Sequence, residues 1–521
     1  MPHEIELKLE LPANDLDRLA MLPWLNALTE GPGKRAELVS VYYDTESFQL
    51  REHGVSLRVR SDGNRYVQTI KAPGKTRRGP LARQEWEHEI GDAAPNLRRA
   101  KRTALRPLIG GHRRRETLRD ALRPVFETRV HRCEIPLRYR DSHIALAIDR
   151  GRIASGERCL PLTEVELELT DGDPAALWEI AGHLAADLPV QFGLTSKAER
   201  GFALSEDVRA AHAHPIALDP HATAGDTFRA IGMACLRHLA LNKEPVLNGD
   251  PEGIHQMRVA VRRLRAALSL FREINRDEEI AEVQHCLKWL LGALAEARDL
   301  DVYVNEAVNP LRREQPDQAG LAVLDDTFDA RRAAAIEAAR QAVRSDEFRQ
   351  TVWRTALWLT GGPWNTTADQ AKARERPVLD HARAELSRRM RKIEKKSRKL
   401  ADLDPRRRHK LRIAIKKLRY ATDFFVGVFP GARAAKRRVA LGKVLKRMQG
   451  ALGRLNDMAV HERMADQTMR RGLPDQTDTA GRETAFAMGL ISGREQAATQ
   501  DLIAGAARTA ARLGKVPPFW A

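Results

Sequence analysis

Several features that mark other classes of protein are scarce or absent in this sequence. Its four cysteines, Cys133, Cys159, Cys235 and Cys286, share no spacing typical of a metal site or a disulfide framework. We therefore expect a reducing, cytoplasmic environment. No stretch approaches the roughly 18 uninterrupted apolar residues of a membrane helix. The N-terminal MPHEIELKLEL lacks the basic start and apolar core of a signal peptide, so we expect neither a leader nor a membrane partner.

The motifs of several common enzyme classes are also missing. The sequence has no GxxxxGK[ST] loop, so a P-loop NTPase is unsupported, and no Cys–His pair or nucleophile elbow stands out. Aromatic residues make up only 5% of the chain, and no RRM or zinc-finger pattern is visible. Because few rings are available for base stacking, this composition disfavours nucleic acid as the partner.

Positive charge is abundant and unevenly distributed. Lys and Arg number 88 against 70 Asp and Glu, which gives a net charge of +18. Residues 1–210 carry 33 basic and 32 acidic side chains, whereas residues 211–521 carry 55 and 38. Nearly all of the excess thus lies in the second part. By itself this excess predicts a polyanionic partner without distinguishing nucleic acid, an anionic membrane and polyphosphate.

Alternation with period two predicts β-strands in the first part, each with one charged and one apolar face. The clearest strands are residues 4–11, 55–60, 83–89 and 164–169; residues 66–71, 128–137 and 144–149 are further candidates. Helices are expected at 14–22, 115–125 and 175–188. An ordinary antiparallel sheet with one solvated face would explain each strand singly.

The charges are sorted by strand, however, which a merely solvated face does not require. Glutamates two residues apart occur on three strands, and Arg58 and Arg60 share a face of another. Paired glutamates suit a hard divalent cation such as Mg²⁺, and clustered Arg and Lys suit phosphate oxygens. Together these residues describe a site for a metal-bound polyphosphate.

Seven segments in this order resemble the CYTH, or triphosphate tunnel metalloenzyme, superfamily, over about residues 1–204. The first is Glu4-Ile5-Glu6-Leu7-Lys8, which is similar to its ExExK signature. The others are Tyr42-Tyr43-Asp44-Thr45, Leu57-Arg58-Val59-Arg60, Thr69-Ile70-Lys71, Arg83-Gln84-Glu85-Trp86-Glu87, Glu164-Val165-Glu166-Leu167-Glu168 and Ser196-Lys197-Ala198-Glu199-Arg200-Gly201. The resemblance implies an eight-stranded antiparallel β-barrel tunnel with flanking helices, and hydrolysis or cyclisation of a triphosphate with Mg²⁺ or Mn²⁺.

The resemblance also implies roles for individual residues. The metal ligands would be Glu4, Glu6, Glu85, Glu87, Asp149, Glu164, Glu166 and Glu168. The triphosphate would be bound by Lys8, Arg58, Arg60, Lys71, Arg129, Arg132 and Lys197. The catalytic set would be Glu4, Glu6, Lys8 and Lys197. Glu164, Glu166 and Glu168 share a face by parity, whereas a regular strand directs at most one of Arg129 and Arg132 into the tunnel.

The second part contains an internal repeat at an offset of 154 residues. Its first copy begins at His255 and reads HQMRVAVRRLR; the second begins at His409 and reads HKLRIAIKKLR. Each copy predicts a helix with a buried apolar stripe and, beside it, four basic residues at 3-4-3 spacing. Like charges so placed repel, and their duplication favours a bound anion over a solvated face. Two related segments, 294–299 and 452–457, follow the copies and could orient the basic helices or cap neighbouring ones.

The duplicated pattern resembles the CHAD domain, an all-α family implicated in binding inorganic polyphosphate, over about residues 222–515. The resemblance implies two antiparallel helical bundles that face each other across a basic surface. The polyphosphate-binding residues would be His255, Arg258, Arg262, Arg263, Arg265, His409, Arg412, Lys416, Lys417 and Arg419. A metal site at the two histidines is weakly supported, since neither has a His or carboxylate at i+3 or i+4.

The expected organisation is an α+β multidomain chain. We expect a CYTH domain at 1–204, a linker at 205–221, and a CHAD domain at 222–515 with repeats at about 222–362 and 376–515. The CYTH-plus-CHAD order resembles bacterial inorganic triphosphatases. It implies Mg²⁺-dependent cleavage of triphosphate to pyrophosphate and phosphate, with polyphosphate bound by the helices and association with polyphosphate granules. The alternatives are a class IV adenylate cyclase, a nucleoside or thiamine triphosphatase, and a non-catalytic polyphosphate-binding protein.

Two basic runs in the first part fall outside these motifs. They are Arg98-Arg99-Ala100-Lys101-Arg102 and Arg113-Arg114-Arg115, between two blocks of strands. Such runs are usually solvated loops or helix faces, and we expect that here.

Overall fold

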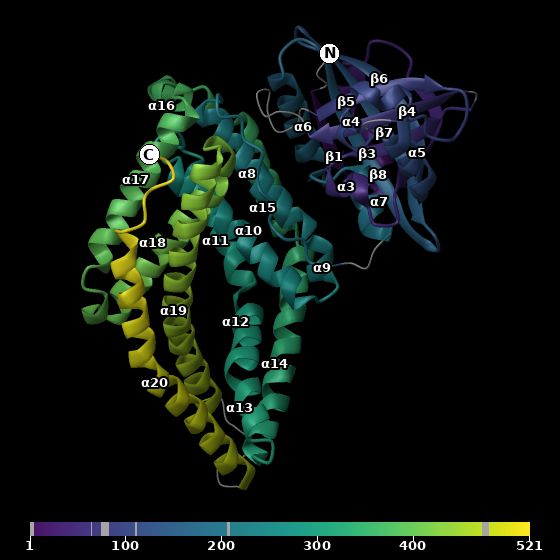
Figure 1. The fold of residues 1–521 in the computed structure, drawn as a ribbon. Coiled ribbons are helices and arrows are strands. Elements are labelled where there is room, and N and C mark those ends of the chain that lie inside the picture. The colour runs from purple at the N-terminus through teal and green to yellow at the C-terminus, as the bar shows by residue number, and fades with distance from the viewer. Residues whose placement is uncertain (1–4, 64, 74–82, 110–111, 206–208, 471–478) are drawn as a thin grey trace. The chain divides into compact units, whose positions relative to one another are not determined.

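A computed structural model describes residues 5–63, 65–73, 83–109, 112–205, 209–470 and 479–521. The chain divides into two units, Met1–Arg209 with Val352–Gly362, and Ala210–Thr351 with Pro363–Ala521 (Figure 1). Among the described residues, no helix combines the length and the apolar character needed to cross a bilayer.

The first unit is built on a single antiparallel sheet. Its strands are β1 (Glu6–Glu10), β2 (Lys34–Asp44), β3 (Ser56–Ser61), β4 (Tyr66–Pro73), β5 (Arg83–Ile90), β6 (Arg123–Tyr139), β7 (Ser142–Ser155), β8 (Arg158–Asp171) and β9 (Gln191–Phe192). Their order across the sheet is β5-β4-β3-β2-β6-β7-β8-β1-β9. The helices are α1 (Ala13–Leu19), α2 (Pro23–Ala27), α3 (Gln49–Glu52), η2 (Arg99–Arg102), α4 (Arg106–Ile109), α5 (His112–Ala121), α6 (Ala175–Asp187) and α7 (Lys197–Ser205).

The expected antiparallel sheet with flanking helices is confirmed, but its details differ. The sheet has nine strands rather than eight, and its end strands β5 and β9 do not pair with each other in the described residues, so the barrel is not closed. The extra strand β9 has two residues, too few to show alternation. β2 could not be predicted from alternation, because both of its faces carry apolar residues: Val39, Val41 and Tyr43 on one, and Leu38 and Tyr42 on the other. The helix expected at 115–125 ends at Ala121, since β6 begins at Arg123.

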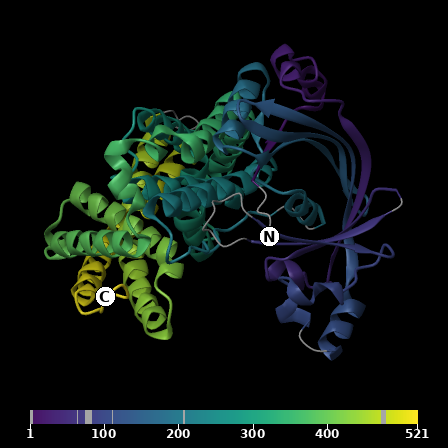
Figure 2. The same ribbon diagram turned by 90° about the horizontal axis from the view of Figure 1, so that it is seen from above.

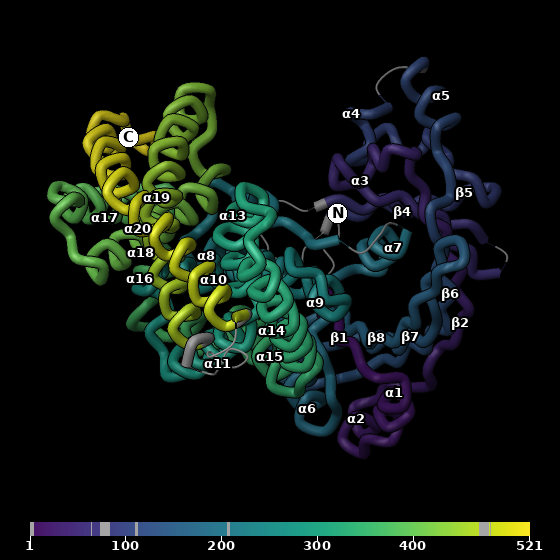
Figure 3. Tube along the Cα trace, turned by 90° about the horizontal axis from the view of Figure 1, so that it is seen from below, coloured from purple at the N-terminus to yellow at the C-terminus, as the bar shows by residue number. Residues whose placement is uncertain are grey.

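The sheet curves around helix α7, and we call the face towards that helix the inner face (Figures 2 and 3). Phe202 of α7 belongs to an apolar cluster with the inner-face residues Tyr42, Phe126, Val130, Ile153 and Leu162. The Phe126 ring stacks on Tyr42, with centroids 4.4 Å apart, and meets Phe202 edge-on at 5.1 Å. This packing closes one part of the inner face and leaves the other part to charged residues.

Gly201 lets α7 approach the sheet closely. A Cβ added there would lie 2.1 Å from the Phe126 ring. We expect Gly201→Ala to cost about 1–3 kcal/mol of stability, because overpacking of this size forces side chains or the helix to move. Thermal unfolding checks the stability. Since α7 also carries Lys197, any triphosphate turnover should fall as well. Gly182→Ala in α6, where an added Cβ meets nothing within 4 Å, should leave turnover unchanged and should not lower stability, because Ala favours a helix interior over Gly.

The outer face of the sheet packs against the remaining helices. Leu50, Val55, Leu57 and Ile70 form a buried cluster with six residues from the segment between β5 and β6: Leu97, Ala100, Leu105, Ile109, Leu118 and Leu122. At the opposite end of the sheet lie α1 and α2 (Figure 3). The outer-face residues of β1, Leu7 and Leu9, are fully buried, which explains the apolar half of the N-terminal alternation.

The second unit is all-helical, as expected. Its longer helices are α8 (Ala224–Leu241), α10 (Pro251–Leu270), α11 (Ile280–Ala293), α12 (Ala295–Tyr303), α14 (Ala319–Arg344), α15 (Asp346–Gly361), α17 (Val378–Ser397), α18 (Pro405–Phe424), α19 (Ala432–Arg470) and α20 (Thr479–Leu513). Shorter pieces are α9 (Lys243–Leu247), η3 (Val304–Val308), α13 (Asn309–Glu314), η4 (Pro363–Asn365), η5 (Ala368–Gln370), α16 (Ala371–Glu375), η6 (Leu400–Asp402) and η7 (Phe425–Val428). By the division above, the last turns of α15 belong to the first unit.

The internal repeat appears as pseudo-twofold symmetry in the second unit. Helices α10 and α18 begin and end 154 residues apart, and α8 and α17 begin 154 apart. The symmetry is visible in one pair of backbone hydrogen bonds, from Ala224 N to Arg376 O at 2.8 Å and from Val378 N to Ala222 O at 3.0 Å. The repeat offset of 154 residues relates Ala224 to Val378 and Ala222 to Arg376, so exchanging the two halves converts one bond into the other, as a twofold axis requires.

Candidate active site

The strand registers place most of the predicted site residues on the inner face. Glu6 lies opposite Glu168, Lys8 opposite Glu166, and Glu10 opposite Glu164 across β1 and β8. The same face continues through Asp149 on β7, Arg132 on β6, Arg58 and Arg60 on β3, Lys71 on β4, and Glu85 and Glu87 on β5. All three glutamates of β8 therefore point the same way, as parity requires.

Glu166 is the centre of the first charged group. Its side chain contacts the Nζ of Lys8, lies 2.7 Å from the Nζ of Lys197, and accepts a hydrogen bond of 2.5 Å from Arg132. Lys197 comes from α7, and Lys8 and Arg132 from β1 and β6. Three cationic groups from three elements thus converge on one buried carboxylate.

Two further carboxylates hold these cations in place. Asp149 is fully buried and accepts two hydrogen bonds of 2.7 Å from Arg132, which fixes the plane of the guanidinium. Glu164 lies 2.9 Å from the Nζ of Lys197 and also contacts Arg200. Arg200 reaches Glu10 as well, at 3.5 Å.

Mutual electrostatics set the ionisation of this group. Burial raises the pKa of Glu166, but Lys197, Lys8 and Arg132 outweigh burial and hold that pKa well below the usual value. For Lys197, burial lowers the pKa, but Glu166, Glu164 and Asp149 outweigh burial and raise the pKa above its usual value, so the ammonium stays charged. The ion pairs are therefore fully formed at neutral pH.

A second, more basic group lies on β3, β4 and β5. The Nζ of Lys71 is 2.7 Å from Glu85, and the guanidinium of Arg58 lies 3.7 Å from Glu85 and 3.9 Å from Glu87. Thr69 donates a hydrogen bond of 3.0 Å to Glu87. Burial raises the pKa of Tyr42, but Arg58, Lys197 and Lys71 lower it by more, so cations from both groups act on the phenol.

Arg60 lies between the two groups and forms no ion pair within the described residues. Its guanidinium has no hydrogen bond or ion pair with any described residue. Burial and then the positive charges of Arg58 and Arg132 lower its pKa to about 10. A guanidinium in this position is available to an anionic ligand, because a bound anion would remove the repulsion.

The acid-rich end of the inner face fits a divalent cation. In the described residues, no three His, Cys, Asp or Glu side chains are already arranged as a metal site, and the carboxylates are turned to Lys and Arg. Carboxyl groups nevertheless exceed cations there: Glu6, Glu10, Glu134, Asp149, Glu164, Glu166 and Glu168 against Lys8, Arg132, Lys197 and Arg200. Burial and neighbouring carboxylates raise the pKa values of Glu6 and Glu168, a crowding that a hard cation would relieve.

One predicted site residue lies outside the described residues, and another lies on the outer face. Glu4 lies outside the described residues. Arg129 lies on the outer face, where it forms an ion pair of 2.7 Å with Glu127. Of the two predicted arginines of β6, Arg132 therefore points inward, and Arg129 is not part of the candidate site.

Four contributors were not expected as site residues: Arg200, Glu10, Glu134 and Tyr42. The signals were present, since Arg200 follows Lys197 by one helical turn and Glu10 shares the parity of Glu6 and Lys8.

In the second unit, α10 and α18 bring basic residues together near the twofold axis. Arg262 lies near enough to Arg412 and Lys416 to lower the pKa of both. Burial first, then Arg412, Arg262 and Arg419, lower the pKa of Lys416 to about 7. Among the described residues, none of Arg262, Arg412 and Lys416 forms an ion pair or side-chain hydrogen bond. We call Arg258, Arg262, Arg412 and Lys416 the basic cluster.

The two repeated segments contact the helices that carry this cluster. Asp299 of α12 lies 3.8 Å from Arg258, and Asn456 of α19 lies 2.6 Å from the Nδ1 of His409. These contacts favour the interpretation that the segments orient the basic helices. His255 is half-buried, and burial and Arg298 lower its pKa to about 4, so its imidazole is neutral.

Two predicted polyphosphate ligands point elsewhere. The guanidinium of Arg263 lies 5.1 Å from the ring centre of Phe424, and the Nζ of Lys417 lies 3.3 Å from the Oγ of Ser269. Phe424 is on α18 and Ser269 on α10, so both cations bridge the two helices. Arg265 is exposed and Arg419 half-buried, and both remain available at the end of the cluster.

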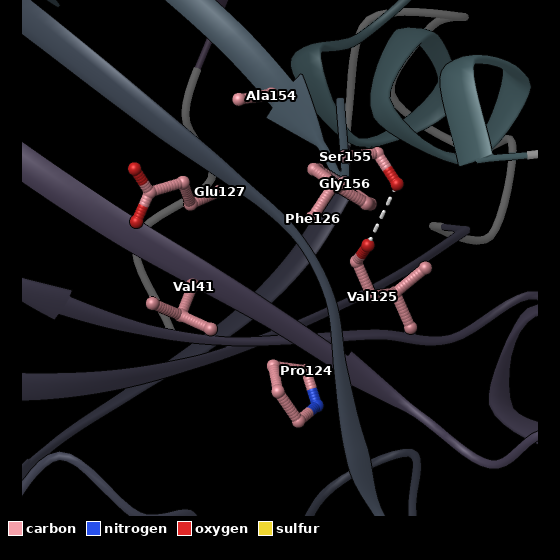
Figure 4. A pocket seen from close by; sticks show the side chains of 8 residues that line it. All are labelled: Val41, Pro124, Val125, Phe126, Glu127, Ala154, Ser155 and Gly156. Atoms are coloured by element: carbon pink, nitrogen blue, oxygen red, sulfur yellow. Dashed lines mark hydrogen bonds between the residues drawn. The ribbon is translucent and has the colours of Figure 1, made fainter. Parts of the chain in front are cut away.

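A separate hollow of about 300 Å³ lies at the β2, β6 and β7 strands of the first unit (Figure 4). It is lined by Val41, Pro124, Val125, Phe126, Glu127, Ala154, Ser155 and Gly156. Its one charged side chain, Glu127, is acidic and pairs with Arg129. None of the predicted site residues lines it, and its charge does not suit a polyanion.

Comparison with protein families agrees with this division into a charged sheet and a basic helical unit. Residues 2–202 match the CYTH domain, and residues 230–466 match the CHAD domain. The chain carries a CYTH domain followed by a CHAD domain. The two domain families predicted from the motifs are thereby confirmed.

Individual relatives cover parts of the chain. An inorganic triphosphatase of Haemophilus influenzae is 28% identical over 205 residues, 39% of this chain and 55% of that protein. The chain thus spans about half the length of this curated relative. The solved CHAD domain of Ricinus communis is 29% identical and covers 59% of this chain and 98% of its own, with a TM-score of 0.50. This likeness supports the CHAD fold.

A Hippeastrum protein described as having a dominant triphosphatase activity is also similar. It is 17% identical and covers 38% of this chain and 95% of its own, with a TM-score of 0.28. A score this low supports no inference about fold or activity.

Proposed function

We propose that the CYTH domain hydrolyses inorganic triphosphate to pyrophosphate and phosphate with a divalent metal. The observation that carries the proposal is the inner face itself, where an acid-rich group beside Lys8 and Lys197 adjoins the more basic group of Arg58 and Lys71. The similarity of the chain to an inorganic triphosphatase over 205 residues, about the length of the CYTH domain, favours the same substrate.

Charge balance makes the metal part of the proposal. A triphosphate carries about four negative charges near neutral pH, so an acid-rich face would repel it without added cations. Glu6, Glu166 and Glu168, with Glu4, are the residues proposed to hold Mg²⁺ or Mn²⁺. When bound, such a metal neutralises phosphate oxygens and favours ionisation of an attacking water.

The chain's own residues would position the phosphates. Arg132, with its plane fixed by Asp149, and the two ammonium groups of Lys8 and Lys197 are placed to bind phosphate oxygens in exchange for Glu166. Arg58, Arg60 and Lys71 would bind the other end of the chain and neutralise the leaving pyrophosphate. Water attacks the terminal phosphorus and the bond to the bridging oxygen breaks, so catalysis is mainly positioning and charge stabilisation.

One assay set tests the proposal. The full chain is incubated with triphosphate, ATP and thiamine triphosphate, each with Mg²⁺ or with EDTA, and phosphate and cyclic AMP are measured. We expect phosphate from triphosphate only when metal is present. No turnover of triphosphate, or turnover unaffected by EDTA, would contradict the proposal. Cyclic AMP from ATP would favour a cyclase instead.

We further propose that the CHAD domain binds inorganic polyphosphate at the basic cluster. Arg262, Arg412 and Lys416 form no ion pair in the part of the chain that the structure describes, and they lie close enough to repel one another. A chain of phosphates offsets that repulsion along its length, because each unit carries about one negative charge. The neutral imidazole of His255 could donate a hydrogen bond to the same chain.

Polyphosphate binding should weaken as the pH rises through neutrality. Lys416 has a pKa of about 7 in the free protein, so its ammonium form, which attracts the anion, prevails only below that pH. We expect affinity to fall about three- to tenfold between pH 6 and pH 9, the loss of one charge-assisted contact. Titration calorimetry at several pH values checks this. Lys416→Arg should flatten the pH profile, because a guanidinium stays protonated; an unchanged slope would contradict this role for Lys416.

A further inference from the structure

The segment between β5 and β6 carries charge that the proposed activities do not use. We call residues 97–109 and 112–123, with η2, α4 and α5, the basic helical element. Residues 97–123 include ten Lys or Arg and two acidic residues, whereas residues 1–210 as a whole are nearly neutral. The positive charge of the CYTH domain is therefore concentrated in this element.

These basic side chains differ from most of those on the inner face because they are exposed and form no ion pairs with described residues. Arg98, Arg99, Lys101, Arg102, Arg106, Arg113 and Arg114 are all exposed, and in the described part of the chain none of them forms an ion pair or side-chain hydrogen bond. The apolar side of the element, by contrast, is buried in the cluster with Leu57 and Ile70 on the outer face of the sheet. The charges are thus presented by a packed support rather than by a loose loop.

The composition of the element limits the kind of anion it fits. Residues 97–123 contain no Phe, Trp or Tyr, so bases have nothing to stack on. No large hydrophobic side chain is exposed in the described residues of the element, so they offer nothing to insert into a lipid bilayer. The element instead presents closely spaced positive charges that repel one another. Such a surface suits an anion that consists only of phosphate groups.

We infer that the basic helical element is a second binding surface for long inorganic polyphosphate, on the CYTH domain itself and separate from the inner face and from the basic cluster of the CHAD domain. The inference rests on the proposed function only in taking the same class of ligand. It adds a surface by which the hydrolytic domain would hold the polymer without help from the helical domain.

The test uses the full chain carrying Arg262→Glu and Lys416→Glu, so that the CHAD cluster contributes little. Binding of long-chain polyphosphate is measured in EDTA for this background and for the same chain with R113Q/R114Q. We expect affinity to fall about five- to tenfold and its dependence on salt to become shallower, since two phosphate contacts are lost. The quadruple change R99Q/R102Q/R113Q/R114Q should lose more, and R113K/R114K should restore binding.

The matched control is R35Q/R152Q, which removes two exposed arginines on the outer face of β2 and β7 that also lack partners among the described residues. An equal loss in the control would show a net-charge effect and overturn the inference, as would unchanged binding in R113Q/R114Q. Tighter binding of single-stranded DNA or anionic vesicles than of polyphosphate, lost in the same variant, would assign the surface to those partners. Triphosphate turnover, measured separately, should be unaffected, so failure here is distinct from failure of the proposed enzyme.

Discussion

Glu166→Gln is expected to reduce triphosphate turnover about 100- to 1,000-fold, the size of effect typical for loss of one well-placed electrostatic contact. The substitution keeps the shape of the side chain but removes the charge that holds Lys8, Lys197 and Arg132 together. With three cations left around a neutral amide, both the metal site and the phosphate-binding geometry should be lost. Phosphate release from triphosphate in the presence of Mg²⁺ measures the effect.

Glu37→Gln is the matched control for this substitution. Glu37 is an exposed glutamate on the outer face of β2, opposite His131. It should keep full turnover and the same melting temperature. Polyphosphate binding should be unchanged in both variants. If Glu166→Gln retained turnover while folded, the central role given to Glu166 would be wrong.

Arg262→Glu combined with Lys416→Glu is expected to weaken polyphosphate binding at least about 100-fold, because two attractive contacts become repulsive within one cluster. The two residues are related by the repeat offset and both lie near Arg412. Titration calorimetry or retention on immobilised polyphosphate measures the loss. Triphosphate turnover should stay nearly constant, since the change lies outside the CYTH domain.

A control for the second prediction lies on the same helices. Arg263→Gln removes a cation of the same repeat that stacks on Phe424 instead of joining the basic cluster. We expect it to lower stability by about 0.5–1 kcal/mol with little effect on polyphosphate affinity. Loss of triphosphate turnover in Arg262→Glu with Lys416→Glu would show that the two activities are not divided between the domains as proposed.

The faces of the strands could be predicted from sequence, but their partners could not. Parity alone places Glu6, Lys8 and Glu10 together, because side chains alternate across a strand. That Lys8 lies opposite Glu166 depends on the pairing of β1 with β8, residues about 160 positions apart, which no local pattern encodes. The same holds for Arg200, whose role depends on where α7 packs.

The helical repeat was more predictable because it is local. The offset of 154 residues gives the matched bounds of α10 and α18, each with Asp at the N-cap and Pro at the first helical position. The structural differences between the two copies could not be predicted from the sequence. The first copy breaks at Leu294 between α11 and α12, whereas the second runs as one helix, α19, through Leu452.

Two backbone hydrogen bonds join the halves of the helical domain, through Ala222 and Ala224 of one half and Arg376 and Val378 of the other. Each half uses the same short stretch of backbone as donor and as acceptor, so the contact is self-complementary. Two identical copies of one half could therefore form it between separate chains. The intact domain thus has the internal contacts of a twofold dimer whose two halves are joined in one chain.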